Sequence, residues 1–247
     1  MCASVVQSGD AVVLYDVPWE TYKQMLDALP NQQFRHVYDR GTLELDSPLI
    51  YNVPWESYEK ILDAFGDRRF RHTYQRGTLE IMSPSNVHER IKRFLGRLIE
   101  MATLECRYAM RSEGSTTQRD SGVEHGLEPD ESYYIGDRPK QSEKGKHAKN
   151  IPPNLVVEVD IRSPKQSRLE SYALLGVREV WRYRKGKIEF FGLAQNGAEY
   201  HPLEFSRAFP MIASKDVAGF VKQFDDVEEN ALILDFVAWL RKRLHKN

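Results

Sequence analysis

Cysteine is scarce in this chain, because Cys2 and Cys106 are the only two among 247 residues. Two cysteines can build neither a disulfide framework nor a cysteine-rich zinc site, and such a low count is typical of a reducing compartment. Apolar runs of about 18 residues, which a membrane-spanning helix requires, are also absent. The first residues lack the basic stretch followed by an apolar run that marks a secretory signal. We therefore expect a globular, cytoplasmic protein without a membrane partner.

Net charge is small as well, with 35 basic and 36 acidic residues giving a formal value of −1 at pH 7. A balanced total neither indicates nor excludes nucleic acid as a partner, because local patches decide. One basic patch lies in "RPKQSEKGKHAK", residues 138–149, where Glu143 is the single acid. A solvated loop explains such a segment, and nucleic-acid binding is the alternative. The candidate nucleic-acid ligands are Lys140, Lys144, Lys146 and Lys149.

The chain repeats itself near its N-terminus. Residues 15–48 match residues 51–84 at a constant offset of 36, with 20 identities in 34 positions. In the second copy, apolar residues between Trp55 and Phe65 recur at three- and four-residue steps, which predicts an amphipathic helix, and Arg76-Gly77 predicts a hairpin turn. A solenoid would need at least three units. Each copy is therefore expected to be a helix followed by a hairpin.

Strand and helix patterns interleave after the second copy. The longest helical pattern covers residues 86–105, two strand patterns flank Lys185-Gly186, and a helical pattern covers residues 228–244. Such interleaving predicts an α/β or α+β fold with a mixed sheet. We expect an N-terminal extension over residues 1–50, which contains the extra helix-hairpin, and a main domain over residues 51–247.

Two carboxylates lie close together in "NLVVEVDIRSP". Side chains alternate along a strand, so Glu158 and Asp160 share one face while Val157 and Val159 share the other. A solvent-exposed edge strand is the simplest explanation of this pattern. If the face is partly buried, the two carboxylates repel each other and need a cation.

A second group of polar residues lies in "LEPDESYYI". Glu128, Asp130 and Ser132 would likewise point to one side of a strand. Three or four carboxylates that converge form an oxygen-only site, which suits Mg²⁺ or Mn²⁺ rather than zinc. Such an ion polarises a phosphoryl oxygen and activates a water molecule. Phosphoester chemistry is therefore the candidate activity.

Five segments together resemble a known family: "GTLEIMSPS", "GSTTQR", "EPDESYYI", "NLVVEVDIRSP" and "SRLESYALLGVREVWRY". In this order and at about this spacing they resemble the Uma family, bacterial proteins described as candidate restriction endonucleases of the PD-(D/E)xK nuclease superfamily. The resemblance runs from about Val53 to about Ile212. It implies a restriction-endonuclease-like fold, in which helices flank a mixed central sheet. It also implies a Mg²⁺- or Mn²⁺-dependent endonuclease that hydrolyses phosphodiester bonds of DNA.

The resemblance also implies roles for individual residues. Pro129-Asp130 looks like the PD element, which makes Asp130 a metal ligand. Glu158 looks like the acidic residue of the (D/E)xK strand, with the carbonyl of Val159 as a possible further ligand. Glu80 resembles an acid often found at that position and would complete the metal site.

The chain departs from the superfamily pattern at Asp160, which stands where the motif has lysine. Asp160 could be an additional metal ligand, or a cation from the next helix could replace the lysine. Arg168 matches the position where the family commonly has a basic residue, and Lys165 could reach the same face. A surface residue paired with a carboxylate is the other interpretation of Arg168. The expected catalytic set is Asp130, Glu158, Asp160 and Arg168.

Loss of the motif lysine supports a second hypothesis, a catalytically inactive nuclease-fold module that binds nucleic acid or a protein partner. A hydrolase of a small phosphoester is a third possibility and would need a closed pocket. His88 matches a histidine often found at the start of the long helix, where a capping or supporting role is more common than catalysis. The apolar C-terminal helix could form a homodimer or pack on its own sheet.

The second copy of the repeat leads directly into the long helix, as the resembling family does. Residues 15–48 are therefore expected to form a supernumerary helix-hairpin that is dispensable for the site. Deleting residues 15–50 should leave a folded protein.

Overall fold

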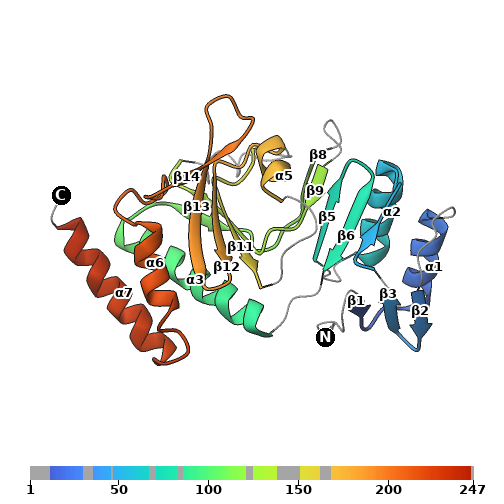
Figure 1. The fold of residues 1–247 in the computed structure, drawn as a ribbon, viewed down its shortest axis with the longest axis horizontal. Coiled ribbons are helices and arrows are strands. Elements are labelled where there is room, and N and C mark those ends of the chain that lie inside the picture. Colours follow the sequence, from blue (N-terminus) through green and yellow to red (C-terminus); the bar gives the residue numbers. More distant parts are fainter. Residues whose placement is uncertain are drawn as a thin grey trace. The chain divides into compact units, whose positions relative to one another are not determined.

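The structure is a computed structural model that describes residues 12–29, 36–45, 47–66, 71–82, 86–120, 125–137, 151–161 and 168–245. The chain forms two compact units (Figure 1). The first unit comprises residues 1–86, 119–128 and 165–171, and the second comprises residues 87–118, 129–164 and 172–247. Each unit has its own hydrophobic core. The division expected from the sequence, an extension over residues 1–50 and a main domain over residues 51–247, stays a prediction.

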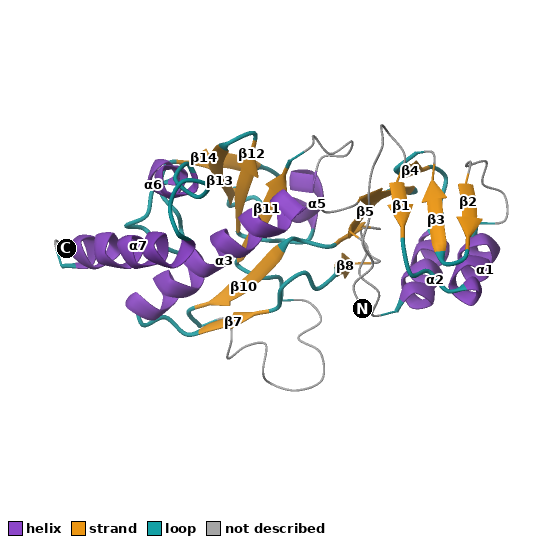
Figure 2. Cartoon of the chain, turned by 90° about the horizontal axis from the view of Figure 1, so that it is seen from below, coloured by secondary structure: helices purple, strands orange, loops and turns teal. Residues whose placement is uncertain are grey.

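The first unit contains both copies of the repeat, and each copy is a helix followed by a hairpin, as expected. The first copy forms α1 (Trp19–Ala28), β2 (His36–Asp39) and β3 (Thr42–Leu45). The second copy forms α2 (Trp55–Phe65), β5 (Arg71–Gln75) and β6 (Thr78–Met82). The two helices lie side by side (Figure 2). Arg76 and Gly77 both have positive φ, 43° and 84°, as a tight hairpin turn requires.

Short strands extend both hairpins. The added strands are β1 (Val12–Leu14), β4 (Leu49–Ile50), β8 (Gln118–Asp120) and β9 (His125–Leu127). They complete a three-stranded sheet of order β1-β3-β2 and a five-stranded sheet of order β4-β6-β5-β9-β8. Apolar side chains of both copies pack in one shared core. The first copy is therefore an integral part of this unit.

The second unit is built on a six-stranded sheet of order β14-β13-β12-β11-β10-β7. Its strands are β7 (Met110–Ser112), β10 (Glu131–Ile135), β11 (Leu155–Asp160), β12 (Glu179–Arg184), β13 (Lys187–Leu193) and β14 (Tyr200–Leu203). The pairing of β11 with β12 is parallel, and the other pairings are antiparallel. The sheet is therefore mixed, as expected.

Helices α3 (Asn86–Glu105), α6 (Ser214–Val221) and α7 (Glu229–Leu244) pack with this sheet. Figure 1 shows α3 lying along one face of the sheet. The core joins Phe94 of α3 and Phe236 of α7 to Val157 and Trp181 of the strands. Helix α5 (Arg168–Leu174) begins in the first unit and ends in the second. A mixed sheet with flanking helices confirms the α/β class expected from the sequence.

Candidate active site

Glu158 and Asp160 lie on an interior strand. Strand β11 has β10 on one side and β12 on the other, and Val157 and Val159 point into the core. Glu158 is only 2% exposed and Asp160 only 7% exposed, on the opposite face of the strand. The exposed edge strand considered above is therefore wrong, and burial makes the repulsion between these carboxylates important.

Strand register brings Asp130 next to this pair. Glu131, the first residue of β10, is the partner of Val157 in an antiparallel pairing. Asp130 comes directly before it and therefore lies beside the end of β11. The buried carboxylate of Asp130 also accepts a 2.6 Å hydrogen bond from the amide of Val159. Asp130, Glu158 and Asp160 thus gather at one end of one sheet face.

Glu128 does not join them. Strand β10 begins only at Glu131, and the backbone amide of Glu128 donates to the carbonyl of His72 at 3.3 Å. Pro129, which has no amide hydrogen, separates the two segments. The expectation that Glu128 shares a strand face with Asp130 and Ser132 is therefore wrong, and Glu128 belongs to the first unit.

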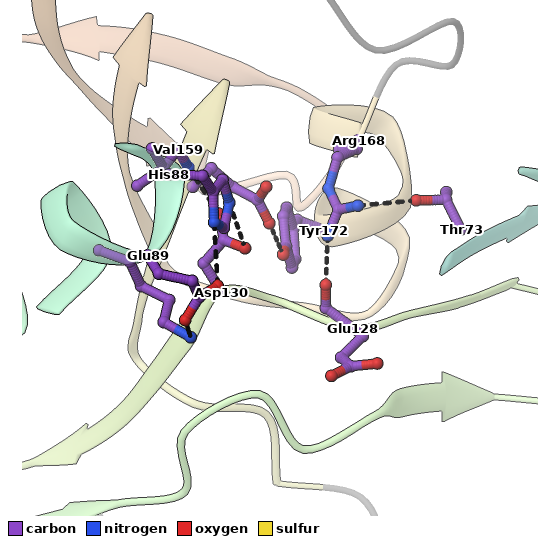
Figure 3. A network of polar contacts seen from close by, with 10 residues as sticks. Thr73, His88, Glu89, Glu128, Asp130, Val159, Arg168 and Tyr172 are labelled. Atoms are coloured by element: carbon purple, nitrogen blue, oxygen red, sulfur yellow. Dashed lines mark hydrogen bonds and ion pairs between the residues drawn. The ribbon is translucent and has the colours of Figure 1, made fainter. Parts of the chain in front are cut away.

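His88, near the start of α3, holds the other oxygen of Asp130 (Figure 3). Its Nε2 lies 3.0 Å from Asp130 Oδ1, and its Nδ1 lies 3.1 Å from Glu89 Oε1. Each ring nitrogen of His88 therefore faces a carboxylate oxygen. The hydrogen bond from His88, aided by Lys92 and opposed by burial, lowers the pKa of Glu89 to about 2. His88 therefore fits a supporting role.

Tyr172 is a site residue that the sequence did not indicate. Its hydroxyl donates to Glu158 Oε1 (Figure 3), and its side chain is fully buried on α5. The available signal was its position on the helix that follows the Glu-x-Asp strand.

Arg182 and Arg184 on β12 also lie near these carboxylates in the sheet register, and the sequence did not indicate them as site residues. Register pairs Glu158 with Arg182 and Asp160 with Arg184, and paired residues of neighbouring strands share one sheet face. The guanidinium of Arg182 binds Glu189 at 2.9 Å and lies over the ring of Phe191. Arg184 is therefore the cation in register with Asp160. Its signal in the sequence was the alternation of "WRYR" on the neighbouring strand.

Two predicted site residues, Glu80 and Arg168, belong to the first unit. Arg168 is buried, and its guanidinium donates to Thr73 Oγ1 at 2.9 Å and to the carbonyl of Glu128 (Figure 3). The interpretation of Arg168 as a surface residue is therefore wrong. Glu80 is buried on β6, opposite Thr73 of β5. The roles of Glu80 and Arg168 in the site stay predictions.

The donor set of the second unit fits a hard divalent cation. Among the residues that the structure describes, no three or more His, Cys, Asp or Glu form a group suited to a metal ion. However, Mg²⁺ usually binds through one or two carboxylates and keeps several waters. The two buried carboxylates Asp130 and Glu158, with their oxygen-only chemistry, match that requirement and do not match zinc.

The basic segment, residues 138–149, is not among the residues that the structure describes. Lys165 and the four candidate nucleic-acid ligands, Lys140, Lys144, Lys146 and Lys149, fall outside the described residues. Over the described parts of the chain, no helix has the length and apolar character needed to cross a membrane.

Comparison with known proteins finds a similar solved structure and a matching family. A crystal structure of a putative nuclease belonging to DUF820 from Anabaena variabilis ATCC 29413 is similar, with 18% identity and a TM-score of 0.43 over 61% of this chain and 90% of that one. No curated protein matches the chain. The profile of the Uma2 family, described as "Putative restriction endonuclease", matches residues 55–224, in agreement with the restriction-endonuclease-like class expected from the sequence. The chain therefore belongs to the Uma2 family.

Proposed function

We propose that the protein is a divalent-metal-dependent endonuclease that hydrolyses phosphodiester bonds of DNA. The observation that carries the proposal is the contact of the buried Asp130 carboxylate with the amide of Val159, the residue between the buried Glu158 and Asp160. Membership of a family described as "Putative restriction endonuclease" supports the same class of reaction. Burial on an interior strand means that these carboxylates need a cation, and the oxygen-only set suits Mg²⁺ or Mn²⁺.

In this proposal Asp130 and Glu158 hold the ion. When bound, the ion supplies Lewis-acid polarisation of the phosphoryl oxygen and lowers the pKa of a water molecule. The chain itself holds the ligands in place. His88 and the amide of Val159 each bind one oxygen of Asp130, and Tyr172 donates to Glu158. Such outer partners fix the orientation of ligating carboxylates.

Asp160 and Arg184 take over the part of the missing motif lysine. The carboxylate of Asp160 accepts the proton of the attacking water, because a carboxylate can act as a general base. Arg184, in register with Asp160, stays protonated and cannot be a base. Its guanidinium stabilises the negative charge that develops on the phosphoryl oxygens. Sequence-based assignment of the same charge-stabilising role to Arg168 stays a prediction.

The test is nicking of supercoiled plasmid DNA with Mg²⁺ or Mn²⁺. Asp130→Ala should lower the cleavage rate by about 100-fold or more, the cost of removing one preorganised electrostatic contact. Asp137→Ala is the matched control, because Asp137 is an exposed acid just beyond the other end of β10. The Asp137→Ala variant should cleave the plasmid at the rate of the wild type. Equal cleavage by wild type and Asp130→Ala would contradict the proposal.

Metal binding is tested separately by calorimetry with Mn²⁺. Glu158→Gln keeps the shape of the side chain and removes its charge, so it should abolish the binding heat while circular dichroism stays unchanged. An unaltered Mn²⁺ affinity in Glu158→Gln would exclude this carboxylate as a ligand.

The replacement of the motif lysine by Asp160 favours a second candidate, an inactive nuclease-fold module that binds nucleic acid or a protein partner. This candidate predicts no cleavage under any metal and no Mn²⁺ binding that depends on Glu158. Nucleic-acid binding by Lys140 to Lys149 would then weaken steeply with added salt, as phosphate contacts do.

A further inference from the structure

The end of the sheet that carries Asp160 also carries a row of cations. Strands β11, β12 and β13 lie side by side in this order (Figure 1). Asp160 is the register partner of Arg184 on β12, and Arg184 is in turn the partner of Lys187 on β13. Paired residues of neighbouring strands point to the same face of a sheet. Asp160, Arg184 and Lys187 therefore form one row across three strands, on the face opposite the core.

A tight turn joins β12 to β13 and adds a third cation. Lys185 and Gly186 are the two residues between the paired Arg184 and Lys187, and both have positive φ, 49° and 78°. This combination is typical of the type I′ turn of a two-residue hairpin. The short turn holds Lys185 directly beside the row. We call Arg184, Lys185 and Lys187 together the basic tip.

The two lysines of the basic tip carry charge that the described fold does not neutralise. One row further into the sheet, Arg182 is paired with Glu189 at 2.9 Å. At the tip the register opposes Arg184 to Lys187, and like charges directly opposite each other destabilise a sheet. Lys185 and Lys187 are exposed, and neither has an ion pair among the residues that the structure describes. An external anion would relieve the repulsion at the tip.

We propose that the basic tip binds phosphates of the DNA strand beside the bond that is cleaved. This inference rests on the proposed function, which makes DNA the substrate of the neighbouring carboxylates. Strands lie about 4.8 Å apart, so the Lys187 backbone lies about 10 Å from that of Asp160, two strand spacings away. Successive phosphates of one DNA strand advance about 3.4 Å along the helix axis. Lys187 therefore meets phosphates within about three nucleotides of the scissile one.

Lysine is suited to this positioning role. Its ammonium group is a compact charge on a flexible stem, so it follows a phosphate without a fixed geometry. Phosphate contacts fix the place and orientation of a protein on DNA and carry no sequence information. Contacts made equally in the ground state and the transition state lower KM and leave kcat unchanged. Lys185 and Lys187 are therefore positioning residues that act on affinity for DNA of any sequence.

The salt dependence of DNA binding tests the basic tip directly. The probe is a fluorescent DNA duplex, and its anisotropy is measured in EDTA so that no cleavage occurs. In Lys185→Gln/Lys187→Gln the slope of log affinity against log salt should be smaller than in the wild type by about 2, one for each lost phosphate contact. Raising the salt from about 50 to 200 mM should then weaken wild-type binding about tenfold more than it weakens binding by this variant.

Lys215→Gln/Lys242→Gln is the matched control. It removes two exposed lysines of the same unit from α6 and α7, the helices whose buried residues belong to the core and so cover the other face of the sheet. This variant should keep the wild-type slope. The melting temperature of Lys185→Gln/Lys187→Gln should not fall below that of the wild type, because the repulsion between Arg184 and Lys187 is removed. Weaker binding would then not result from unfolding.

Plasmid nicking with Mg²⁺ or Mn²⁺ separates this inference from the proposed function. In Lys185→Gln/Lys187→Gln the KM for DNA should rise about tenfold or more, while kcat stays unchanged. A wild-type salt slope and KM in this variant, or a wild type that binds no DNA, would overturn the inference. A lower kcat at unchanged KM would overturn the positioning role. A reduced salt slope in a protein that nicks no plasmid would support the inference and contradict the proposed function.

Discussion

Glu179 is a buried carboxylate outside the candidate site, and it sets a pH dependence of stability. Its oxygens accept hydrogen bonds from the indole of Trp181 and from the amides of Arg207 and Ala208. Burial nevertheless raises the pKa of Glu179 above 4.5, because desolvation outweighs these bonds. The folded protein therefore binds more protons than the unfolded chain between the two pKa values, and the free energy of unfolding falls as pH rises through that window.

Glu179→Gln removes this titration. Denaturant unfolding from pH 4 to pH 8 should show that the stability of the wild type relative to Glu179→Gln declines as pH rises. Gln cannot accept all three hydrogen bonds, so the variant should still be less stable at pH 4, by about 1–3 kcal/mol for an unsatisfied buried group. A stability difference that is constant with pH would contradict the raised pKa.

His88 should act through Asp130 and not on the substrate. His88→Ala removes the hydrogen bond to Asp130 Oδ1, and loss of such a supporting partner typically costs 10–100-fold in metal affinity or activity. His201→Ala, an exposed change on β14, should have no effect. Calorimetry with Mn²⁺ is the measurement, and an unchanged affinity in His88→Ala would show that Asp130 needs no support.

At the scale of the residue, the sequence predicted the three carboxylates more readily than their surroundings. Alternation within one strand is a local property, so the shared face of Glu158 and Asp160 could be predicted. Neither Arg184 nor Tyr172 could be found in that way, because their proximity depends on which strand lies beside β11 and on where α5 packs. Pairing of strands is a tertiary property that periodicity does not contain.

At the scale of the element, the approach of β9 to α2 depends on a residue without a side chain. In Gly126→Ala the new Cβ would meet the ring and hydroxyl of the fully buried Tyr58, and overpacking of this kind costs about 1–3 kcal/mol. Gly219→Ala on α6 is the matched change, because nothing lies within 4 Å of its Cβ position and it should stabilise by about 0.5–1 kcal/mol. Thermal unfolding should show a lower melting temperature for Gly126→Ala and a higher one for Gly219→Ala. An unchanged melting temperature in Gly126→Ala would show that β9 can move away from Tyr58.

Long elements were predictable and short ones were not. The helix expected over residues 86–105 is α3, and the strand at Glu158 is β11, because both have enough residues to show a period. Strands β1, β4 and β9 contain two or three residues each, too few for alternation to be detected. Helix α6 has eight residues, about two turns, which is too short for a helical period to stand out.

At the scale of the whole molecule, the first repeat copy and the carboxylate cluster lie in different units with separate cores. The sequence predicts that residues 15–50 are dispensable for the site. That segment, however, includes β4, which pairs with β6, and Thr21 of α1, whose hydroxyl donates to the carbonyl of Ala64 at 3.1 Å. Removing the first copy therefore exposes part of a shared core, while the core of the second unit stays complete.

Deletion of residues 1–46, which keeps β4, separates these two consequences. The melting temperature of the first unit should fall by about 15 °C, since a loss of about 3 kcal/mol shifts the midpoint of a domain of this size by about 4–8 °C per kcal/mol. Mn²⁺ binding that depends on Glu158 should persist, because Asp130, Glu158 and Asp160 lie on β11 and the segment before β10. Calorimetry of wild type and deletion variant at a temperature where both are folded makes the comparison. Loss of Mn²⁺ binding in a folded deletion variant would show that the first copy, with its Glu44, serves the site after all.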